Sequence, residues 1–458
     1  MLFFAVIMSP LVRALDARLP GVSLPDATGG GARPRFAVSS YVDDVVAVLE
    51  RPTDGEVLST TLETFADESG LRVNASKSQA MPLGAWRTDT PLFCDYVDRM
   101  RVLGVVFTTR VQDLLAANWE ARMTAVTLAV RDARVRALNV VQRVAYANTY
   151  VLPLLWHLAA VVPLTAEAVR DVTAELGKFL WAGYPLRVAM DVMVLPADKG
   201  GLCLHHPGLK ARALFTGRWL TASRSPEASL AGAWLHVLAV LYPPGTSLPL
   251  AAGHYRAIRE AATVNEDLRG RELNRALYAA ALEKHADNNI RAIPRVQRRR
   301  PDADWGRVWR CVSSPLHDVA VRDSWFRVAH GVIGTRVMMA ATNRADSQLC
   351  PECAVPDTTT HHLAECGPNR RTIWRWASTT MAALTGATVP LPPKTMVEPG
   401  FDTPRTTKAA AAMWLCGVTV AFLETRTSAD VGQFQKFVMK RRAEANIPAS
   451  VRDVLQRL

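Results

Sequence analysis

Hydrophobic residues change their spacing along the chain, and the spacing predicts which segments are helices and which are strands. Residues 2–19 and 54–68 carry apolar side chains at about every third or fourth position, which is typical of helices that bury one face. Residues 36–40 and 45–49 are instead rich in strand-forming side chains, and the short segment between them leaves room only for a tight turn. The pattern therefore predicts a helix, a β-hairpin and a second helix.

The turn of this hairpin, Tyr41-Val42-Asp43-Asp44, brings two neighbouring carboxylates to the edge of a sheet. Two negative charges this close repel each other unless a cation lies between them. Paired Mg²⁺ ions, about 3.5–4 Å apart, stabilise the attacking and leaving oxygens of phosphoryl transfer and are held by carboxylates. Aspartate is also common in surface turns, so these four residues alone leave both a metal site and a plain turn open.

Two further strands are predicted in the next part of the chain. Residues 71–78 begin as a short strand and run into a turn that contains Lys77. Residues 102–107 form another short strand, in which Gly104 allows a neighbouring backbone to approach closely. A lone lysine is most often a solvated surface charge, so the residue type alone gives Lys77 no function.

The composition is that of a large basic protein. The chain has 458 residues, of which 49% are hydrophobic, and this is enough for the cores of two or three domains. It has 54 lysines and arginines against 42 acidic residues, and the net charge of +12 favours a polyanionic partner such as nucleic acid or an anionic membrane surface. Seven cysteines, mostly scattered, argue against a disulfide framework and for a reducing compartment.

Three apolar stretches raise the question of a signal peptide or a membrane span. Residues 1–8 lack the basic segment and the small-residue cleavage site of a signal peptide. Residues 151–164 and 409–423 are shorter than the ~18 residues that indicate a membrane span, which predicts buried core helices. We therefore expect a nuclear or cytoplasmic protein that is not secreted and has no membrane partner. A secreted or membrane-anchored helical protein stays an alternative.

Three of the seven cysteines lie within a segment of seventeen residues and form a metal-binding pattern. Cys350 and Cys353 make a Cys-x-x-Cys pair, and His361 and Cys366 follow it. Three thiolates and an imidazole suit tetrahedral Zn²⁺, and four protein ligands leave no open position for a substrate. The pattern predicts a closed, structural zinc site, with His362 as a rival to His361.

Two basic segments are candidates for contact with phosphates. Arg298, Arg299 and Arg300 form a cluster that is either a solvated linker or a phosphate-binding site. Near the cysteines, arginines alternate with Trp374 and Trp376, as in proteins that bind single strands. The two tryptophans equally suit packing against the zinc site.

The order and separation of these blocks resemble the reverse transcriptases of LINE-type, non-LTR retrotransposons. The Tyr-x-Asp-Asp box is followed at family-like distances by a Gly-Leu-x-Val-Asn-x-x-Lys block, a Leu-Gly pair, a helical region with a Gly-Gly-Leu block, and a zinc knuckle whose spacing selects His361. The matching segments are Tyr41–Asp44, residues 65–78, Leu103-Gly104, residues 195–204 and residues 350–366.

The resemblance implies a function for several of these residues. Asp43 and Asp44 are expected to bind Mg²⁺ in a two-metal site, and Lys77 to lie near the departing pyrophosphate. Tyr41 and the Leu103-Gly104 pair are expected to contact nucleic acid, together with the arginine cluster at residues 298–300. The implied reaction is RNA-directed DNA synthesis from an RNA template, a DNA primer and dNTPs, used for target-primed insertion.

The chain also departs from the family. The family's palm needs a third carboxylate on an earlier strand, and neither Asp16 nor Asp26 has that strand context. We therefore expect the C-terminal part of a larger polyprotein, inactive as a polymerase by itself. The alternative is a non-catalytic remnant that binds nucleic acid through its basic helical region and zinc knuckle.

The expected fold class is α+β, with a small antiparallel sheet followed by a mostly helical chain. The expected domains are a partial palm (1–109), a helical thumb (110–222), a helical linker with the basic cluster (223–300), helices with the zinc knuckle (301–380) and a helical tail (381–458).

Overall fold

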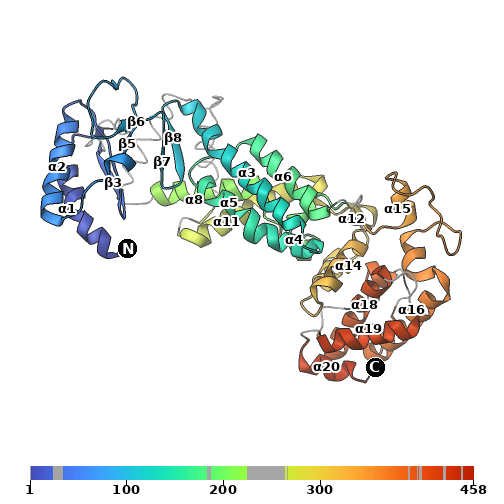
Figure 1. Ribbon diagram of the computed structural model, residues 1–458. Coiled ribbons are helices and arrows are strands. Elements are labelled where there is room, and N and C mark those ends of the chain that lie inside the picture. Colours follow the sequence, from blue (N-terminus) through green and yellow to red (C-terminus); the bar gives the residue numbers. More distant parts are fainter. Residues whose placement is uncertain are drawn as a thin grey trace. The chain divides into compact units, whose positions relative to one another are not determined.

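The fold is taken from a computed structural model (Figure 1). It describes residues 2–457 except 24–34, 183–186, 224–263, 266, 390–391, 393, 400, 402–404, 426–429 and 445–446. The chain divides into two compact units. Unit 1 comprises Met1–Thr124, Leu155–Ala168 and Gly208–Ala279, and unit 2 comprises Ala125–Leu154, Val169–Pro207 and Ala280–Leu458. The described part is mostly helical with small sheets, as expected for the α+β class. The boundaries of the five expected domains stay a prediction.

Unit 1 begins with the predicted order of helix, hairpin and helix. Each of its described sheets has two strands, and all pair antiparallel except β5 and β6. The elements up to residue 108 are α1 (Leu2–Arg18), β1 (Val22–Ser23), β2 (Arg35–Phe36), β3 (Val38–Tyr41), β4 (Asp44–Ala47), α2 (Asp54–Ser69), η1 (Ala75–Lys77), β5 (Gln79–Ala80), β6 (Asp95–Tyr96), β7 (Arg99–Val102) and β8 (Val105–Thr108).

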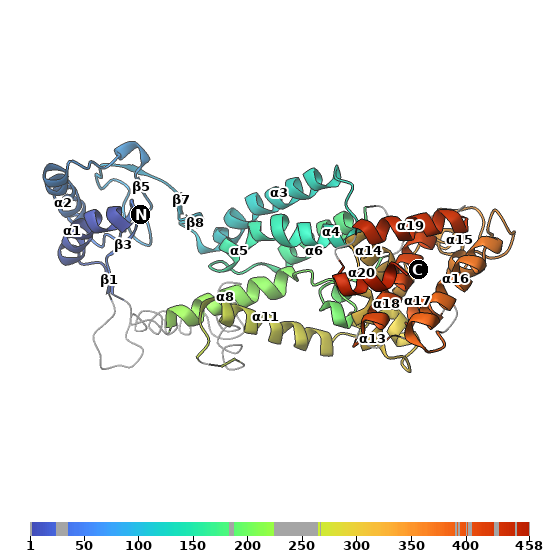
Figure 2. The same cartoon turned by 90° about the horizontal axis from the view of Figure 1, so that it is seen from below.

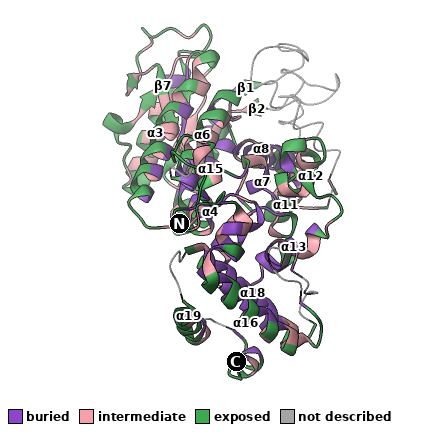
Figure 3. Cartoon of the chain, turned by 90° about the vertical axis from the view of Figure 1, so that its right-hand side faces the viewer, coloured by how far each residue is buried: buried purple, intermediate pink, exposed green. Residues whose placement is uncertain are grey.

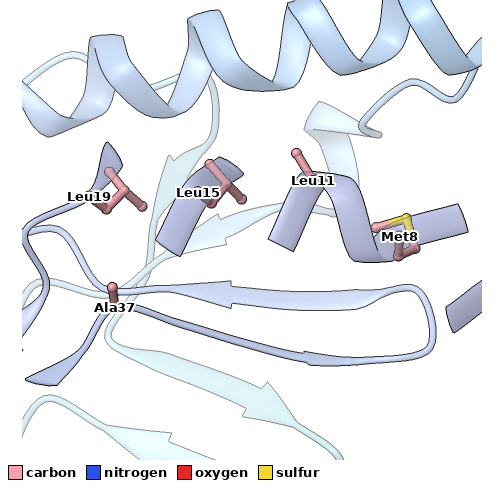
Figure 4. Close-up of a cluster of buried hydrophobic side chains, with 5 residues drawn as sticks. All are labelled: Met8, Leu11, Leu15, Leu19 and Ala37. Atoms are coloured by element: carbon pink, nitrogen blue, oxygen red, sulfur yellow. The ribbon is translucent and has the colours of Figure 1, made fainter. Parts of the chain in front are cut away.

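Helix α1 forms the core of this part of unit 1. Its buried side chains recur every three or four residues, and they pack against apolar residues of α2 and of the β3–β4 hairpin. Figure 4 shows four of them in a row along the helix, with Ala37 at the base of the hairpin. They are Met8, Leu11 and Leu15 of α1 and Leu19, which follows the end of the helix, and all are at most 8% exposed. The prediction from hydrophobic spacing is therefore confirmed.

The expectation of a single strand over residues 102–107 was wrong, because this segment is a hairpin. Val102 pairs with Val105, and the two residues between them form the turn. Leu103 and Gly104 have φ angles of +48° and +84°, the left-handed values that a two-residue hairpin turn of type I′ requires. The neighbour of Gly104 is a side chain and not the expected backbone, since a Cβ there would lie 3.4 Å from the His157 ring.

Helices make up the middle of the chain. In unit 1, α8 and α11 pack through Ala213, Leu220, Leu273 and Leu277, and Figure 2 shows these helices side by side. The elements are η2 (Val111–Asp113), α3 (Leu114–Arg134), α4 (Val140–Tyr146), the π-helical turn η3 (Ala147–Val151), α5 (Pro153–Ala159), α6 (Ala166–Trp181), α7 (Met190–Met193), η4 (Ala197–Lys199), α8 (Pro207–Ser223) and α11 (Gly270–Asp287).

The C-terminal part of unit 2 is arranged around α18. Helices α14, α16, α19 and α20 surround it (Figures 1 and 2). The elements are η5 (Ile290–Ala292), α12 (Arg295–Arg299), α13 (Trp305–Val312), α14 (Val319–Ala329), α15 (Arg336–Ala340), the π-helical turn η6 (His361–Glu365), α16 (Gly367–Thr385), α17 (Lys394–Val397), α18 (Thr407–Thr425), α19 (Val431–Glu444) and α20 (Ala449–Leu455).

Helix α18 is a buried core helix, as its apolar sequence predicts. Residues 410–423 are buried without interruption, and Figure 3 shows the helix in the colour of buried residues. Its 19 residues make it longer than the apolar stretch alone indicates, because polar residues extend both ends. Of the described helices, it alone is long and apolar enough to cross a membrane, but 78% of the relevant window is buried inside the protein. A helix that is buried to this extent inside the protein is a core helix.

A buried ion-pair network joins three helices of unit 2. Arg327 on α14 binds Glu424 on α18 through two contacts, of 2.5 and 3.2 Å, and donates to Asp323 at 3.0 Å. The other oxygen of Asp323 accepts the backbone N–H of Val140 at the start of α4, at 2.9 Å. All three charged side chains are at most 11% exposed, so each charge depends on its partners for compensation.

A stack of rings fixes the Gly-Gly-Leu block in unit 2. Trp309 stacks between Trp305 and His330, with ring centroids 5.4 and 4.7 Å away. The His330 ring contacts the carbonyl oxygen of Gly200 through Nε2 at 2.9 Å. Gly200 has a φ angle of +85°, and a Cβ there would lie 2.8 Å from the Trp309 ring. Only glycine fits this turn without a shift of the tryptophan.

Removal of the central cation should destabilise unit 2. We expect Arg327→Met to lower the free energy of unfolding by about 3–5 kcal/mol, because Asp323 and Glu424 stay buried without their cation. Urea unfolding followed by circular dichroism measures the change. The matched control is Arg131→Met, whose side chain is 72% exposed and whose loss should cost at most about 0.5 kcal/mol. Equal effects of the two variants would contradict this account.

The buried histidines make stability depend on pH. Burial lowers the pKa of His330 to about 4, although its contact with the Gly200 carbonyl opposes this shift. The folded protein then holds His330 neutral, so its contribution is complete above pH ~6.5 and is lost as the pH falls toward 4. We expect His330→Phe to flatten the fall in unfolding free energy between pH 6.5 and 4.5. Parallel curves for the variant and the unmodified protein would refute the assignment.

Candidate metal centre and the Asp-Asp hairpin

Three thiols and one imidazole meet at one point in unit 2. The Sγ atom of Cys366 lies 3.6 Å from that of Cys350 and 3.8 Å from that of Cys353. Tetrahedral zinc with Zn–S bonds of about 2.3 Å separates two sulfurs by about 3.8 Å. In the described part of the chain, this is the one group of three or more His, Cys, Asp or Glu side chains that could hold a metal ion. Its ligand atoms, from Cys350, Cys353, His361 and Cys366, all lie within 4.8 Å of one another.

A tight turn brings the first two cysteines together. The backbone N–H of Cys350 donates to the carbonyl of Val355 at 2.7 Å, and that of Ala354 donates to the carbonyl of Cys350 at 2.9 Å. Ala354 has a φ angle of +54°, which reverses the chain direction. Leu349 then pairs with Pro356. The turn therefore presents the Cys-x-x-Cys pair on one side of the loop.

A π-helical turn sets the spacing of the other two ligands. The backbone N–H of Cys366 donates to the carbonyl of His361 at 2.8 Å, across five residues. A π-turn is wider than an α-turn, so residues five apart come to lie near one another. Cys366 is also the N-cap of α16. The four-residue gap between this histidine and cysteine is thus explained by the backbone.

The polar atoms of the cluster fit a zinc ion. Nε2 of His361 is buried and has no hydrogen-bond partner among the described residues. Such an unpaired nitrogen costs about 1–3 kcal/mol, and a metal ion would compensate for it. Burial raises the pKa of the Cys350 thiol, but interactions with the His361 ring and nearby backbone amides lower it overall, to about 7. Burial raises the pKa of Cys366.

The rival histidine does not enter the cluster. His362 Nδ1 lies 3.4 Å from a carboxylate oxygen of Asp357. Burial lowers the pKa of His362, and the charge of Asp357 opposes this shift. The second oxygen of Asp357 accepts the backbone N–H of Arg336 at 2.8 Å. His362 therefore helps to fix the loop that carries the cluster.

The two tryptophans near the cysteines pack inside unit 2, one of them against the π-turn of the candidate metal centre. Trp374 is 1% exposed, and its ring N–H donates to the carbonyl of Leu363 in the π-turn at 3.0 Å. Trp376 lies edge-on to Phe434, with ring centroids 5.5 Å apart. Arg370 is only 5% exposed. Of the two interpretations of this segment, packing is the one that the side-chain positions favour.

The Asp-Asp hairpin of unit 1 has the predicted form. Tyr41 pairs with Asp44 across the hairpin, and Val42 and Asp43 form the turn. Val42 has a φ angle of +59°, which is unusual for a β-branched residue and stores strain of about 1–3 kcal/mol. The side chains of Tyr41, Asp43 and Asp44 are all exposed. The turn therefore presents both carboxylates to solvent.

The described residues do not complete a Mg²⁺ site at this turn. Across the described part of the chain, no third His, Cys, Asp or Glu side chain joins Asp43 and Asp44 in a metal-binding group. Asp16 instead pairs with Arg35 at 2.9 Å. Asp26 lies outside the described residues. Two exposed carboxylates alone are a weak site for an ion that keeps most of its hydration shell.

The other predicted nucleic-acid residues lie on separate turns. Lys77 ends η1 with an exposed side chain, and its backbone N–H donates to Asn74 Oδ1 at 3.2 Å. The Leu103-Gly104 pair forms the β7–β8 turn. Arg300 pairs with Glu398, which partly neutralises it, whereas Arg298 and Arg299 are exposed at the end of α12. Their contact with nucleic acid stays a prediction.

Two side chains that position these segments were missed by the sequence analysis. His157 on α5 contacts the carbonyl oxygen of Leu103 through Nε2, at 2.9 Å, and so fixes the β7–β8 turn. Asn148 in η3 donates to the carbonyl of Cys203 and accepts the N–H of His205, both at 2.9 Å. The spacing of apolar residues carries no signal for either contact, because both join segments at least 54 residues apart.

Comparison with known proteins gives one informative similarity. The chain is 26% identical over 235 residues to the "Transposon TX1 uncharacterized 149 kDa protein" of Xenopus laevis. This similarity is to a transposon protein. The match covers 49% of the chain and 17% of the Xenopus protein, so the chain spans a small part of that relative. No family model matches the chain. The similarity supports the transposon relationship implied by the sequence blocks.

Adjacent histidines provide a sharp test of the metal centre. We expect the purified chain to contain one zinc ion, and His361→Gln to lose most of it, because a neutral amide replaces the imidazole ligand. His362→Gln should keep the zinc. Elemental analysis of dialysed protein measures the metal content of both variants. Retention of zinc by His361→Gln together with its loss in His362→Gln would show that the ligand is wrongly assigned.

Proposed function

We propose that this chain is part of a reverse transcriptase of a LINE-type, non-LTR retrotransposon, and that its own residues bind the RNA template and the DNA primer. The observation that carries the proposal is the β3–β4 hairpin, which pairs Tyr41 with Asp44 and holds Asp43 in its turn. The same segment is the Tyr-x-Asp-Asp box of the family that the sequence resembles. The similarity to a transposon protein of Xenopus laevis supports the same assignment.

The packing around the hairpin also suits this proposal. Buried residues of α1 and apolar residues of α2 support the strands from one side, so the turn with Asp43 and Asp44 has a rigid base. The second hairpin turn, Leu103-Gly104, is fixed by the contact of its carbonyl with His157. Both turns are therefore held by tertiary contacts, as residues that position a primer end require.

Catalysis by the family's route needs more than these residues. Asp43 and Asp44 are the proposed Mg²⁺ ligands, but the described part of the chain gathers no third carboxylate with them. We therefore assign no catalytic step to the 458 residues alone. Lys77 and the dNTP substrate would act only in a completed palm.

The function left to the chain itself is nucleic-acid binding. Its net charge of +12 favours contact with phosphates, with Arg298 and Arg299 exposed at the end of a helix. The four zinc ligands have a structural role, because they leave no open coordination position. They fix the loop before α16, and the position of this loop determines part of the surface of unit 2. A nuclear or cytoplasmic ribonucleoprotein, without a membrane partner, is the proposed setting.

The proposal makes separate predictions for binding and for catalysis. The chain should bind RNA or single-stranded DNA with an affinity that falls steeply with salt, because binding releases condensed counterions. Cys350→Ser should weaken binding, whereas Asp43→Asn should leave it unchanged. Fluorescence anisotropy of a labelled strand at several salt concentrations measures both. With Mg²⁺, dNTPs and a template-primer, the unmodified chain should give no extension.

Two outcomes would contradict these statements. Primer extension that is abolished by Asp43→Asn would show that the chain completes its catalytic site. Failure of the zinc-loaded chain to bind any strand at low salt would remove nucleic-acid binding as its function.

A further inference from the structure

A pair of tyrosines in unit 2 lies beside an arginine. Tyr146 ends α4 and Tyr150 lies in the π-turn η3, with ring centroids 4.9 Å apart. The side chain of Tyr150 is 61% exposed, whereas Tyr146 is half-buried against Phe179 of α6, at 6.0 Å. One ring is thus anchored and the other faces solvent.

A cation lies against the anchored ring. The Arg136 guanidinium lies 5.6 Å from the centroid of the Tyr146 ring. A guanidinium beside an aromatic ring can contact a phosphate while the ring contacts a base, so this arrangement complements a nucleic-acid backbone.

The backbone beneath the tyrosines is held in place. Asn148 lies two residues before Tyr150. Its side chain donates a hydrogen bond to the carbonyl of Cys203 and accepts one from the backbone N–H of His205. The π-turn thus has a fixed partner segment, and π-turns are frequent at functional sites. An exposed aromatic ring on a rigid turn loses little conformational freedom when a planar group stacks on it.

We propose that Tyr146 and Tyr150 form a stacking platform for a base of single-stranded nucleic acid, with Arg136 contacting an adjacent phosphate. Single-strand sites combine a basic groove with aromatic rings, and every base offers a π-face to such a ring. This inference rests on the proposed nucleic-acid binding and assigns it a place in the structure.

The test separates stacking from charge. Anisotropy titrations should use an unstructured labelled RNA and a matched strand of the same length and charge whose central nucleotides lack bases. Tyr150→Ala should weaken binding of the intact RNA about 5- to 150-fold, the effect of losing one stacked base. Its affinity for the abasic strand should not change. Tyr150→Phe should bind both strands like the unmodified protein, because the ring is retained.

Two control variants complete the experiment. Phe3→Ala removes another exposed aromatic ring, on α1, which is 84% exposed, and should not affect either titration. Arg136→Gln should lower the slope of log Kd against log salt by about 0.7, the contribution of one phosphate contact on a single strand.

The outcomes are distinguishable. If the unmodified chain binds neither strand, the proposed function fails, and this inference fails with it. If it binds and Tyr150→Ala has no effect, or weakens both strands equally, only the stacking platform is refuted.

Discussion

Four donor atoms within 4.8 Å of one another set the strongest constraint on unit 2. Cys366 is both a member of this group and the N-cap of α16, so the position of that helix depends on the cluster. Helix α16 packs on the buried helix α18, and α18 carries Glu424, the partner of Arg327. From Arg327 the contacts continue through Asp323 to the start of α4. A metal ion at one end would thus stabilise a continuous series of packed elements.

The two metal sites implied by the sequence differ in how many of their ligands the described residues bring together. The zinc ligands come from one segment of seventeen residues, so a local fold can bring all of them together. The Mg²⁺ site of a polymerase palm takes its carboxylates from separate strands, and its completion depends on segments far apart in sequence. The described residues accordingly gather the Cys₃His group and leave Asp43 and Asp44 as an exposed pair. The nucleic-acid binding that we propose relies on the first group and not on the second.

Sequence patterns predicted the local features of the fold and missed the contacts between distant segments. Hydrophobic spacing was enough for α1, the hairpin and α18, since each buries one face or its whole length. It was wrong at residues 71–74, which precede the 3-10 helix η1 and form no strand, and at residues 102–107, where a Leu-Gly turn divides one apparent strand into two. The family-like spacing of the zinc knuckle favoured His361 over His362, and the π-turn and the contact of His362 with Asp357 give the structural reason. The partners of Asn148, Arg327 and His330 depend on tertiary packing, for which no local pattern exists.

The four ligands that we assign to zinc, Cys350, Cys353, His361 and Cys366, would form a closed site. X-ray absorption at the zinc edge of the purified chain is the first experiment to make, because it counts the bound sulfur and nitrogen atoms. We predict three sulfurs at about 2.3 Å and one nitrogen at about 2.0 Å, with no bound water. A shell dominated by oxygen and nitrogen, or one with only two sulfurs, would contradict the account.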